Sequence, residues 1–145
     1  MVRPIARGGG PTQVQVRYAL VELEKLRPHE QTQPGLLARV LADIRRDGCV
    51  RRPVLVESKH LVILDGHHRY EALKVLGCRR VPVYLVDYED DGIGLTTWPR
   101  AIVKTVTKAE VIDRGIRSDP FPPKTTRHRV SIELEDVRVS LDELR

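Results

Sequence analysis

The first half of the chain combines an alternating segment with a segment of helical spacing. Apolar and polar residues alternate from position 14 to position 23, which predicts a strand with a break. After the loop "RPHEQTQP", Pro34 can open a helix, and Gly48 stands on its C-terminal side. The apolar stripe of this helix has the spacing of one face: Leu37, Val40, Leu41 and Ile44.

Two short apolar runs and a second helix follow. "PVLVE" and "LVILD" are rich in β-branched residues and are separated by "SKH", which predicts a hairpin. Apolar residues at a spacing of three predict a helix from His67 to Leu76, with Gly77 as its terminator. "VPVYLVDY" predicts another strand, and Pro82 near its start indicates an edge position in the sheet.

After Tyr88 the pattern becomes less regular. "EDDGIGLTTWPR" is acidic and contains glycine, so we expect a mobile loop. Thr107 and Glu110 fit a capping box that opens a helix through about Arg117. Three prolines within four residues make "SDPFPPKTTRH" irregular, "RVSIELEDVRV" alternates as a final strand, and "SLDELR" is a short helical end.

These elements predict an α+β fold with one small mixed sheet, flanking helices and a short C-terminal helix–loop–strand lobe. We expect residues 1–13, rich in Gly, Pro and Arg, to be a flexible tail. Residues 14–88 would then form the main domain, and residues 89–145 a lobe packed on it. The chain has 145 residues, of which 41% are hydrophobic, so it can bury a core.

Net charge and cysteine content exclude few classes of function. The net charge of +5 suits an anionic partner, either a nucleic acid or a phosphorylated ligand, but acids are spread through the same segments. Cys49 and Cys78 form neither a disulfide framework nor a zinc motif, and we interpret them as small core residues. No apolar run reaches the roughly 20 residues that span a bilayer, so we expect a cytoplasmic protein without membrane contact.

The densest polar cluster, "DGHHR" at positions 65 to 69, lies where a predicted strand meets a predicted helix. Adjacent side chains diverge, so His67 and His68 cannot easily bind one metal ion together. The first N–H groups of a helix have no intrahelical partner and attract anions, and Gly66 lets a ligand approach the backbone. The alternative is that Asp65 only caps the helix and the histidines form a solvated first turn.

The segment from about residue 20 to residue 88 resembles the N-terminal domain of the ParB and sulfiredoxin superfamily. The shared features come in order: an L-x-P loop, a helix ending in "IRRDG", "RPVLV", a strand running into "DGHHRYEALKVLG", and "VPV". ParB proteins of DNA segregation carry G-E-R-R at the motif, and sulfiredoxins carry G-C-H-R. The D-G-H-H-R version is similar to archaeal free serine kinases, and "FPPKTTRH" and the preceding tryptophan agree with that family.

The resemblance implies transfer of a phosphoryl group from ADP or ATP to the hydroxyl of free L-serine, giving O-phospho-L-serine, a cysteine precursor. Glu30 matches the position of the catalytic base, and Asp65 would be catalytic and hold Mg²⁺. Gly66, His67, His68 and Arg69 would bind the nucleotide phosphates. The amino acid would contact Trp98, Thr125, Thr126, Arg127 and His128. The alternative for Trp98 is ordinary core packing.

Two other functions remain open from the sequence. A ParB-like, nucleotide-binding and DNA-associated regulator would suit the basic charge, but no helix-turn-helix pattern follows the main domain, so we do not expect nucleic-acid binding. A sulfiredoxin-like reductase would need a reactive cysteine in the motif. The sequence leaves open the choice between ADP and ATP, the choice between serine and threonine, the oligomeric state, and any role of Glu89, Asp90 and Asp91.

Overall fold

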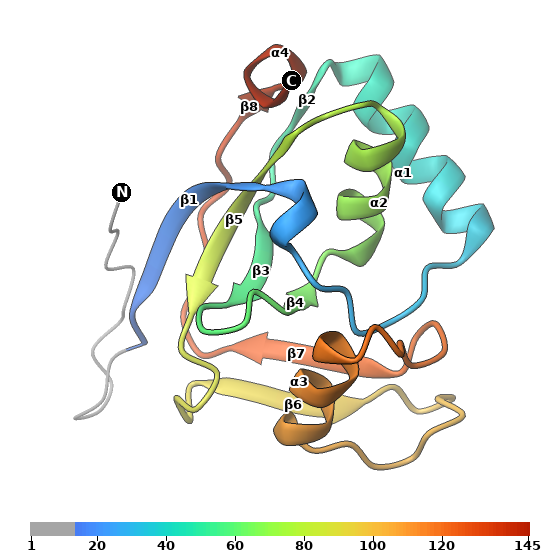
Figure 1. Ribbon diagram of the computed structural model, residues 1–145, viewed down its shortest axis with the longest axis vertical. Coiled ribbons are helices and arrows are strands. Elements are labelled where there is room, and N and C mark those ends of the chain that lie inside the picture. Colours follow the sequence, from blue (N-terminus) through green and yellow to red (C-terminus); the bar gives the residue numbers. More distant parts are fainter. Residues whose placement is uncertain (1–13) are drawn as a thin grey trace.

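The computed structural model describes residues 14–145, which form an α+β fold around a four-stranded sheet (Figure 1). The strand order is β1-β5-β3-β4, with β5 antiparallel to β1 and parallel to β3, and β3 antiparallel to β4. The bounds are Val16–Glu22 for β1, Val54–Glu57 for β3, Ile63–Asp65 for β4 and Arg80–Val86 for β5. The predicted fold class, with a small mixed sheet and flanking helices, is confirmed.

Both faces of this sheet are buried, because its strands alternate side chains between two hydrophobic clusters. Val54 and Val56 of β3 belong to the cluster beneath the helices, whereas Leu55 belongs to the cluster on the opposite face. The same alternation separates Val83 from Tyr84 in β5. The sheet is therefore a central layer with structure packed on each side.

The first cluster is covered by α1, Pro34–Asp47, and α2, His67–Val75, which pack against each other. Pro34 is the first residue of α1, and Gly48 ends the helix in a left-handed conformation with φ 69°. Pro34 and Gly48 thus predicted both ends of α1. The break expected within residues 14–23 is wrong, because β1 runs without interruption from Val16 to Glu22 and a 3₁₀ helix, Leu23–Lys25, follows it.

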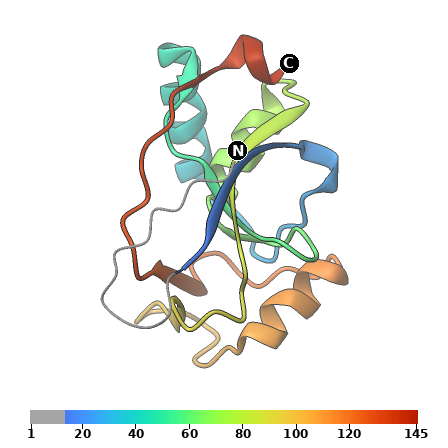
Figure 2. The ribbon, with the colours of Figure 1, turned by 90° about the vertical axis from the view of Figure 1, so that its left-hand side faces the viewer.

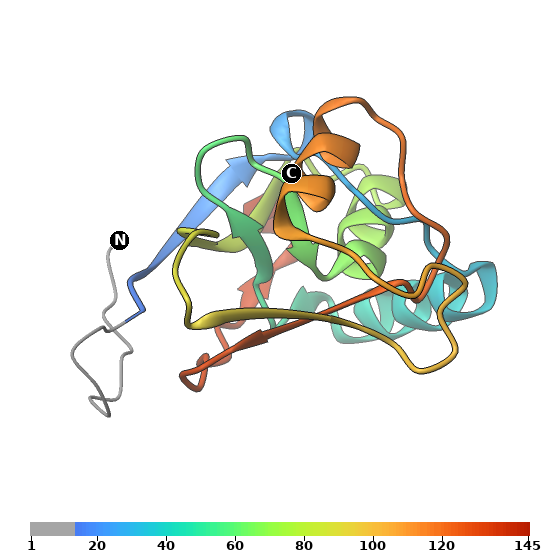
Figure 3. The same cartoon turned by 90° about the horizontal axis from the view of Figure 1, so that it is seen from below.

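The second cluster is covered by a two-stranded sheet and a helix. β6, Ile93–Thr97, pairs antiparallel with β7, Thr126–Val130 (Figure 3). The expected mobile loop after Tyr88 is therefore wrong over residues 93–97, and the expected irregular segment is wrong from Thr126 onward. Ile93 is fully buried, so pairing with a distant strand and burial together overcome the weak local signal.

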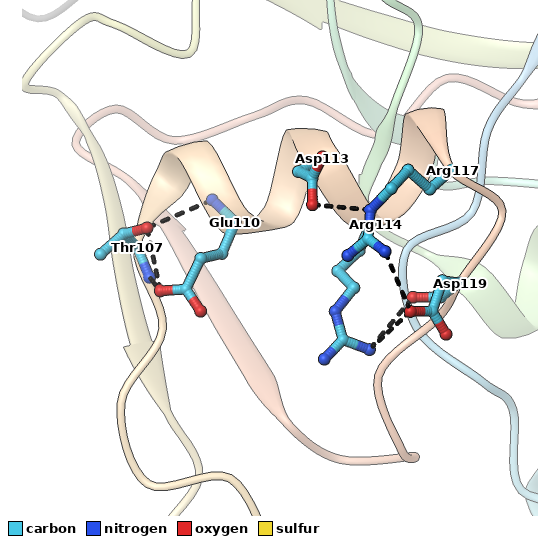
Figure 4. Close-up of polar contacts among 6 residues, drawn as sticks. All are labelled: Thr107, Glu110, Asp113, Arg114, Arg117 and Asp119. Carbon is cyan, nitrogen blue, oxygen red and sulfur yellow. Dashed lines mark hydrogen bonds and ion pairs between the residues drawn. The ribbon is translucent and has the colours of Figure 1, made fainter.

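The helix α3, Lys108–Ile116, has the predicted capping box: the Thr107 hydroxyl accepts from the N–H of Glu110, whose carboxylate accepts from the N–H of Thr107 (Figure 4). At its C-terminal end, Arg117 bonds Asp113 at 2.8 Å and lies 3.6 Å from Asp119. These ion pairs are exposed, so each contributes little on its own. They fix the turn after α3, which leads to the site.

The chain after β7 runs along the outside of the molecule to its opposite end, where it joins the layer of α1 and α2 (Figure 2). The expected strand over residues 129–139 is wrong in its middle: residues 129 and 130 end β7, residues 131–138 form no strand, and β8, Val139–Ser140, pairs with β2, Cys49–Val50. The predicted helical end is α4, Leu141–Leu144. Leu144 is fully buried, so this segment completes the first cluster.

Pro82 does not mark an edge strand, because β5 lies between β1 and β3. The ladder with β3 begins at Val83, opposite Val54, so Pro82 lies just outside it. Its missing N–H therefore costs no hydrogen bond on that side. The edges of the main sheet are β1 and β4.

The cysteines, the absence of a membrane-spanning segment, the tail and the domain division were also predicted from the sequence. Cys49 and Cys78 are buried free thiols in core positions, as predicted. No helix within residues 14–145 is long and apolar enough to cross a membrane. The predicted tail, residues 1–13, lies outside the described residues, and the domain division after Tyr88 stays a prediction.

Candidate functional site

The site forms where β4 ends and α2 begins. Asp65 is the last residue of β4, Gly66 makes the turn with φ 101°, and His67 opens the helix. The N-cap residue is Gly66, and no side chain caps the first turn. Asp65 is therefore not the helix cap, and the N–H groups at this end of α2 have no capping side chain to bind them. This uncapped helix end is the feature on which the prediction of anion binding rests, and the binding itself stays a prediction.

Both histidines of the motif turn toward the loop between the 3₁₀ helix and α1. Nε2 of His67 accepts a hydrogen bond from the backbone N–H of His29 at 3.2 Å. Nε2 of His68 accepts from the N–H of Gln33 at 3.0 Å. These two bonds hold the loop against α2, and they leave only Nδ1 of each ring for a ligand. Their role in phosphate binding stays a prediction.

Arg69 folds back over the turn. A Cβ atom built on Gly66 would lie 2.8 Å from Nη2 of Arg69, so any larger residue here would push the guanidinium away. Nε of Arg69 is buried and has no hydrogen-bond partner among the described residues. Burial lowers the pKa of Arg69, and the charge of Asp65 opposes that shift. A buried cation with an unused donor is suited to bind an anion.

Glu30 lies in the loop that the two histidines hold. Its Oε1 accepts from the N–H of Thr126 at 2.8 Å, from the Thr126 hydroxyl at 2.9 Å and from the N–H of Thr125 at 3.2 Å. Burial raises the pKa of Glu30, and these hydrogen bonds oppose the rise. The sequence predicted Glu30, Thr125 and Thr126 as site residues, and the structure brings them into contact.

His29 is a site residue that sequence reasoning missed. Its side chain is fully buried, with Nδ1 at 2.5 Å from the carbonyl oxygen of Ile63 and Nε2 at 2.9 Å from the Thr126 hydroxyl. Burial lowers its pKa to about 4. This position lies in a proline-containing loop, outside any periodic apolar pattern, and a histidine in such a loop is ordinarily exposed. The sequence therefore offers no reason to expect its burial. Its place directly before Glu30 is the only local signal.

His128 belongs to the same buried cluster of rings. Its ring centroid lies 5.7 Å from that of His29, and the ring of His67 lies 4.7 Å from His29 on another side. Nε2 of His128 bonds the Tyr88 hydroxyl at 2.6 Å. Burial lowers the pKa of His128 to about 3. The rings are therefore neutral near pH 7 and act as hydrogen-bonding groups.

Trp98 forms an open wall of the site. Its indole N–H donates to the carbonyl oxygen of Thr126 at 3.0 Å. Trp98 is 36% exposed, so the alternative that it packs in the core is wrong. The guanidinium of Arg127 lies 4.6 Å from the ring centroid, and the ammonium of Lys124 lies 5.6 Å from it. The wall therefore carries two cations next to an aromatic face.

Two cavities meet at Asp65, Arg69 and His128. The smaller cavity, about 370 Å³, contains most of the predicted site residues: Glu30, Gly66, His67, His68, Trp98, Thr126 and Arg127. The larger cavity, about 840 Å³, extends along Pro53, Leu55 and Tyr84 to the segment 130–136. Thr125 is fully buried and does not line the smaller cavity, but its N–H donates to Glu30, which does.

The acidic run at positions 89 to 91 lines neither cavity. Glu89 lies 3.6 Å from Lys59, and the Asp90 carboxylate accepts from the N–H of Gly92 at 2.7 Å. The first contact joins the run to the turn between β3 and β4, and the second lies within the turn before β6. We therefore leave this run out of the site.

Donor chemistry at the site fits Mg²⁺ and does not fit zinc. Within residues 14–145, no group of three or more His, Cys, Asp or Glu side chains is placed to hold a metal ion. Asp65 is a single exposed carboxylate at the start of α2. One carboxylate suits Mg²⁺, which is held largely by phosphates and water, whereas zinc needs several protein ligands.

No protein-family model matches the chain. The chain is 39% identical over 109 residues to an ATP-dependent L-serine kinase of Staphylothermus marinus, a match covering 70% of this chain and 43% of the relative. It is 33% identical over 104 residues to an ADP-dependent L-serine kinase of Thermococcus kodakarensis, covering 68% and 42%. A ParB-like protein of Sulfolobus acidocaldarius is 34% identical over 82 residues, covering 57% and 41%.

The chain thus spans about two fifths of the length of the curated relatives it matches. Among solved structures, a free serine kinase in complex with AMP superposes with a TM-score of 0.81 at 21% identity, covering 88% of this chain and 93% of that chain. SbnI of Staphylococcus aureus with a C-terminal truncation gives 0.74 at 17% identity, covering 88% and 89%. The chain is therefore a homologue of the L-serine kinases, and it has the fold of the free serine kinases.

Proposed function

We propose that the protein transfers a phosphoryl group from ATP or ADP to the hydroxyl of a free amino acid, L-serine first among candidates. The observation that carries this proposal is the placement of Glu30. Its carboxylate is held by three hydrogen bonds in a small cavity that also contains the N-terminus of α2. A fixed, partly buried carboxylate beside an anion-binding helix end is what alcohol phosphorylation needs.

The two cavities suggest how the substrates divide. The larger one has apolar and aromatic sides at Leu55 and Tyr84 and has room for a nucleoside. The smaller one has room for an amino acid and contains Glu30. Because Arg69 lies in the wall between them, it would hold the phosphate chain at the junction. Its planar guanidinium can make a bidentate contact with phosphate oxygens.

Binding of the amino acid would use the Trp98 wall. Arg127 presents a guanidinium to the smaller cavity, which suits the substrate carboxylate, and Trp98 limits the size of the side chain that fits. Thr126 and His128 line the same cavity with polar atoms. The substrate hydroxyl would then face Glu30.

Glu30 is the group that would take the hydroxyl proton. Its raised pKa makes the carboxylate a stronger base than an exposed glutamate, since burial favours the protonated form. Arg69 and the free N–H groups of α2 would stabilise the charge on the transferred group. Asp65 would hold Mg²⁺, which, when bound, neutralises charge on the phosphates.

A direct assay tests this proposal. The purified protein is incubated with Mg²⁺, with ATP or ADP, and with a panel of free amino acids that includes serine, threonine and alanine, and phosphorylated product is measured by mass spectrometry. We expect O-phosphoserine with at least one donor and none with alanine, which has no hydroxyl. Absence of product with every donor and every acceptor would exclude the kinase.

The same preparation tests the DNA-associated alternative. We expect no binding to duplex DNA at physiological salt, because the cations at the site surround a cavity sized for small molecules. Salt-dependent DNA binding without phosphorylation would favour the ParB-like alternative instead. With ATP or ADP as donor, the reaction belongs in the cytoplasm.

A further inference from the structure

Three side chains behind the smaller cavity form one continuous hydrogen-bonded chain. Oε1 of Glu30 lies 2.9 Å from the Thr126 hydroxyl, and that hydroxyl lies 2.9 Å from Nε2 of His29. The far nitrogen, Nδ1 of His29, lies 2.5 Å from the carbonyl oxygen of Ile63. A carbonyl oxygen can only accept, so Nδ1 must carry a proton.

The Thr126 hydroxyl has one proton and two neighbours that can accept it. If it donates to an ionised Glu30, then Nε2 of His29 faces a hydroxyl oxygen and needs a proton of its own. If it donates to neutral His29, then Glu30 must be protonated to donate to the hydroxyl. Either fully bonded arrangement contains one proton more than ionised Glu30 and neutral His29 have together.

We propose that His29 is a positioning residue for Glu30: the Thr126 hydroxyl joins the two side chains into one chain that shares a single proton. The chain of contacts is buried at His29 and reaches the cavity at Glu30. The catalytic consequence of this inference rests on the proposed function, whereas the shared proton itself does not.

In the proposed reaction, ionised Glu30 takes the proton of the serine hydroxyl. The hydroxyl oxygen bonds to the transferred phosphorus, and the bond from that phosphorus to the nucleotide oxygen breaks. Protonated Glu30 then donates to Thr126, whose own proton turns toward Nε2 of His29. When Glu30 takes the proton, the Thr126 hydroxyl can donate to Nε2 of His29, a hydrogen bond that is missing while Glu30 is ionised. This gain favours proton acceptance by Glu30.

The neighbouring ionisable groups limit the proton to these residues. His67 of α2 and His128 of β7 face His29, and burial lowers the pKa of both. The other ionisable groups of the smaller cavity lie around Glu30: Asp65, His68, Arg69, Lys124 and Arg127. Among the described residues, none of these five side chains forms a hydrogen bond to His29 or Thr126, and His67 accepts only from the backbone N–H of His29.

Nuclear magnetic resonance of the wild-type protein without substrate tests the shared proton. The carboxyl carbon of Glu30 reports its protonation, and the ring nitrogens of His29 report whether Nε2 accepts a hydrogen bond. We expect the Nε2 signal to change at the pH where Glu30 titrates. If the Nε2 signal of His29 does not change while Glu30 titrates, the proposal is overturned.

Variants at the two other positions of the chain give opposite shifts. Thr126→Val removes a donor to the carboxylate, so the pKa of Glu30 should rise by about one pH unit. His29→Gln supplies a permanent amide donor to the Thr126 hydroxyl, which should turn that proton toward Glu30 and lower its pKa. Thr126→Ser keeps the hydroxyl and should retain the wild-type pKa and the response of His29.

A purely structural role for His29 would not produce shifts of opposite sign, so shifts of the same sign in Thr126→Val and His29→Gln would overturn the proposal. If the variants are active, the acidic limb of kcat/KM against pH should follow the measured pKa of Glu30. If the His29 signal changes with the titration of Glu30 but the wild-type protein phosphorylates no substrate, then only the proposed function is contradicted.

Discussion

The first residue of α2, His67, holds the loop of the proposed base, because its Nε2 accepts the backbone N–H of His29 at 3.2 Å. His68 repeats this contact one residue on, at Gln33. The paired histidines of the motif thus connect the N-terminal end of α2 to the loop that carries Glu30. Their position in the fold explains why two adjacent histidines serve one site without sharing a ligand.

We expect His68→Ala to lower kcat about fivefold, since losing one hydrogen bond of roughly 1 kcal/mol loosens the Glu30 loop. The free energy of unfolding should fall by no more than about 1 kcal/mol, because His68 is partly exposed and contributes this one hydrogen bond. His68→Gln, which keeps an acceptor, should recover part of the loss. If His68 instead binds phosphate directly, its main effect would be on the KM for the nucleotide, and glutamine would not restore it.

Glu30→Gln should lower turnover by about 10²- to 10⁴-fold, as expected for removal of a general base, while nucleotide affinity stays near that of the wild type. The amide oxygen can still accept from the N–H groups of Thr125 and Thr126. Turnover and nucleotide binding by calorimetry measure the two effects. Glu24→Gln, an exposed carboxylate of the 3₁₀ helix, is the matched control. Full turnover in Glu30→Gln would exclude Glu30 as the base.

Gly66→Ala should destabilise the protein by about 1–3 kcal/mol and weaken nucleotide binding. The position has φ 101°, and the added Cβ would lie 2.8 Å from Nη2 of Arg69 and 3.2 Å from Val54. Gly35→Ala is the control, because Gly35 lies in α1 with no atom within 4 Å of its added Cβ. There alanine should stabilise by about 0.5–1 kcal/mol. Urea unfolding of both variants checks the predicted difference in sign.

Arg127→Ala should raise the KM for the amino acid about tenfold or more and change the KM for the nucleotide little, because its guanidinium lies over Trp98 in the smaller cavity. Arg129→Ala removes an exposed cation of the same strand that lines neither cavity, and it should leave both constants unchanged. A dominant effect of Arg127→Ala on the nucleotide would place Arg127 at the phosphates.

The free energy of unfolding should fall as the pH decreases below about 6.5, where histidine titrates in an unfolded chain. Burial lowers the pKa of His29 to about 4 and that of His128 to about 3. Between those values and about 6.5, the unfolded chain binds protons that the folded protein does not. Each histidine therefore costs about 1.4 kcal/mol per pH unit through this window, and the loss stops below its folded pKa.

Urea unfolding at a series of pH values measures this slope. In His29→Gln the slope should be shallower by one proton, because one histidine no longer contributes. Parallel curves for the wild type and the variant would show that His29 is not the buried neutral group described here.

Local signals predicted the helices because their causes lie within each segment. Pro34 and Gly48 bound α1, the Thr107–Glu110 capping box starts α3, and both features act over a few residues. The strand-to-helix turn at Gly66 was predicted for the same reason. The sequence could not place β6 or the central position of β5, because strand pairing depends on partners far along the chain.

The site shows the same division between local and distant information. By itself, the sequence determined the strand-to-helix turn at residues 65–69, for which it predicted anion binding, and through resemblance it proposed Glu30 and Thr126. Only the tertiary structure brought them together with His29, because the loop, α2 and β7 meet through contacts that span up to 97 positions. Burial then removed water from the histidines and set their protonation, and no local pattern encodes that environment.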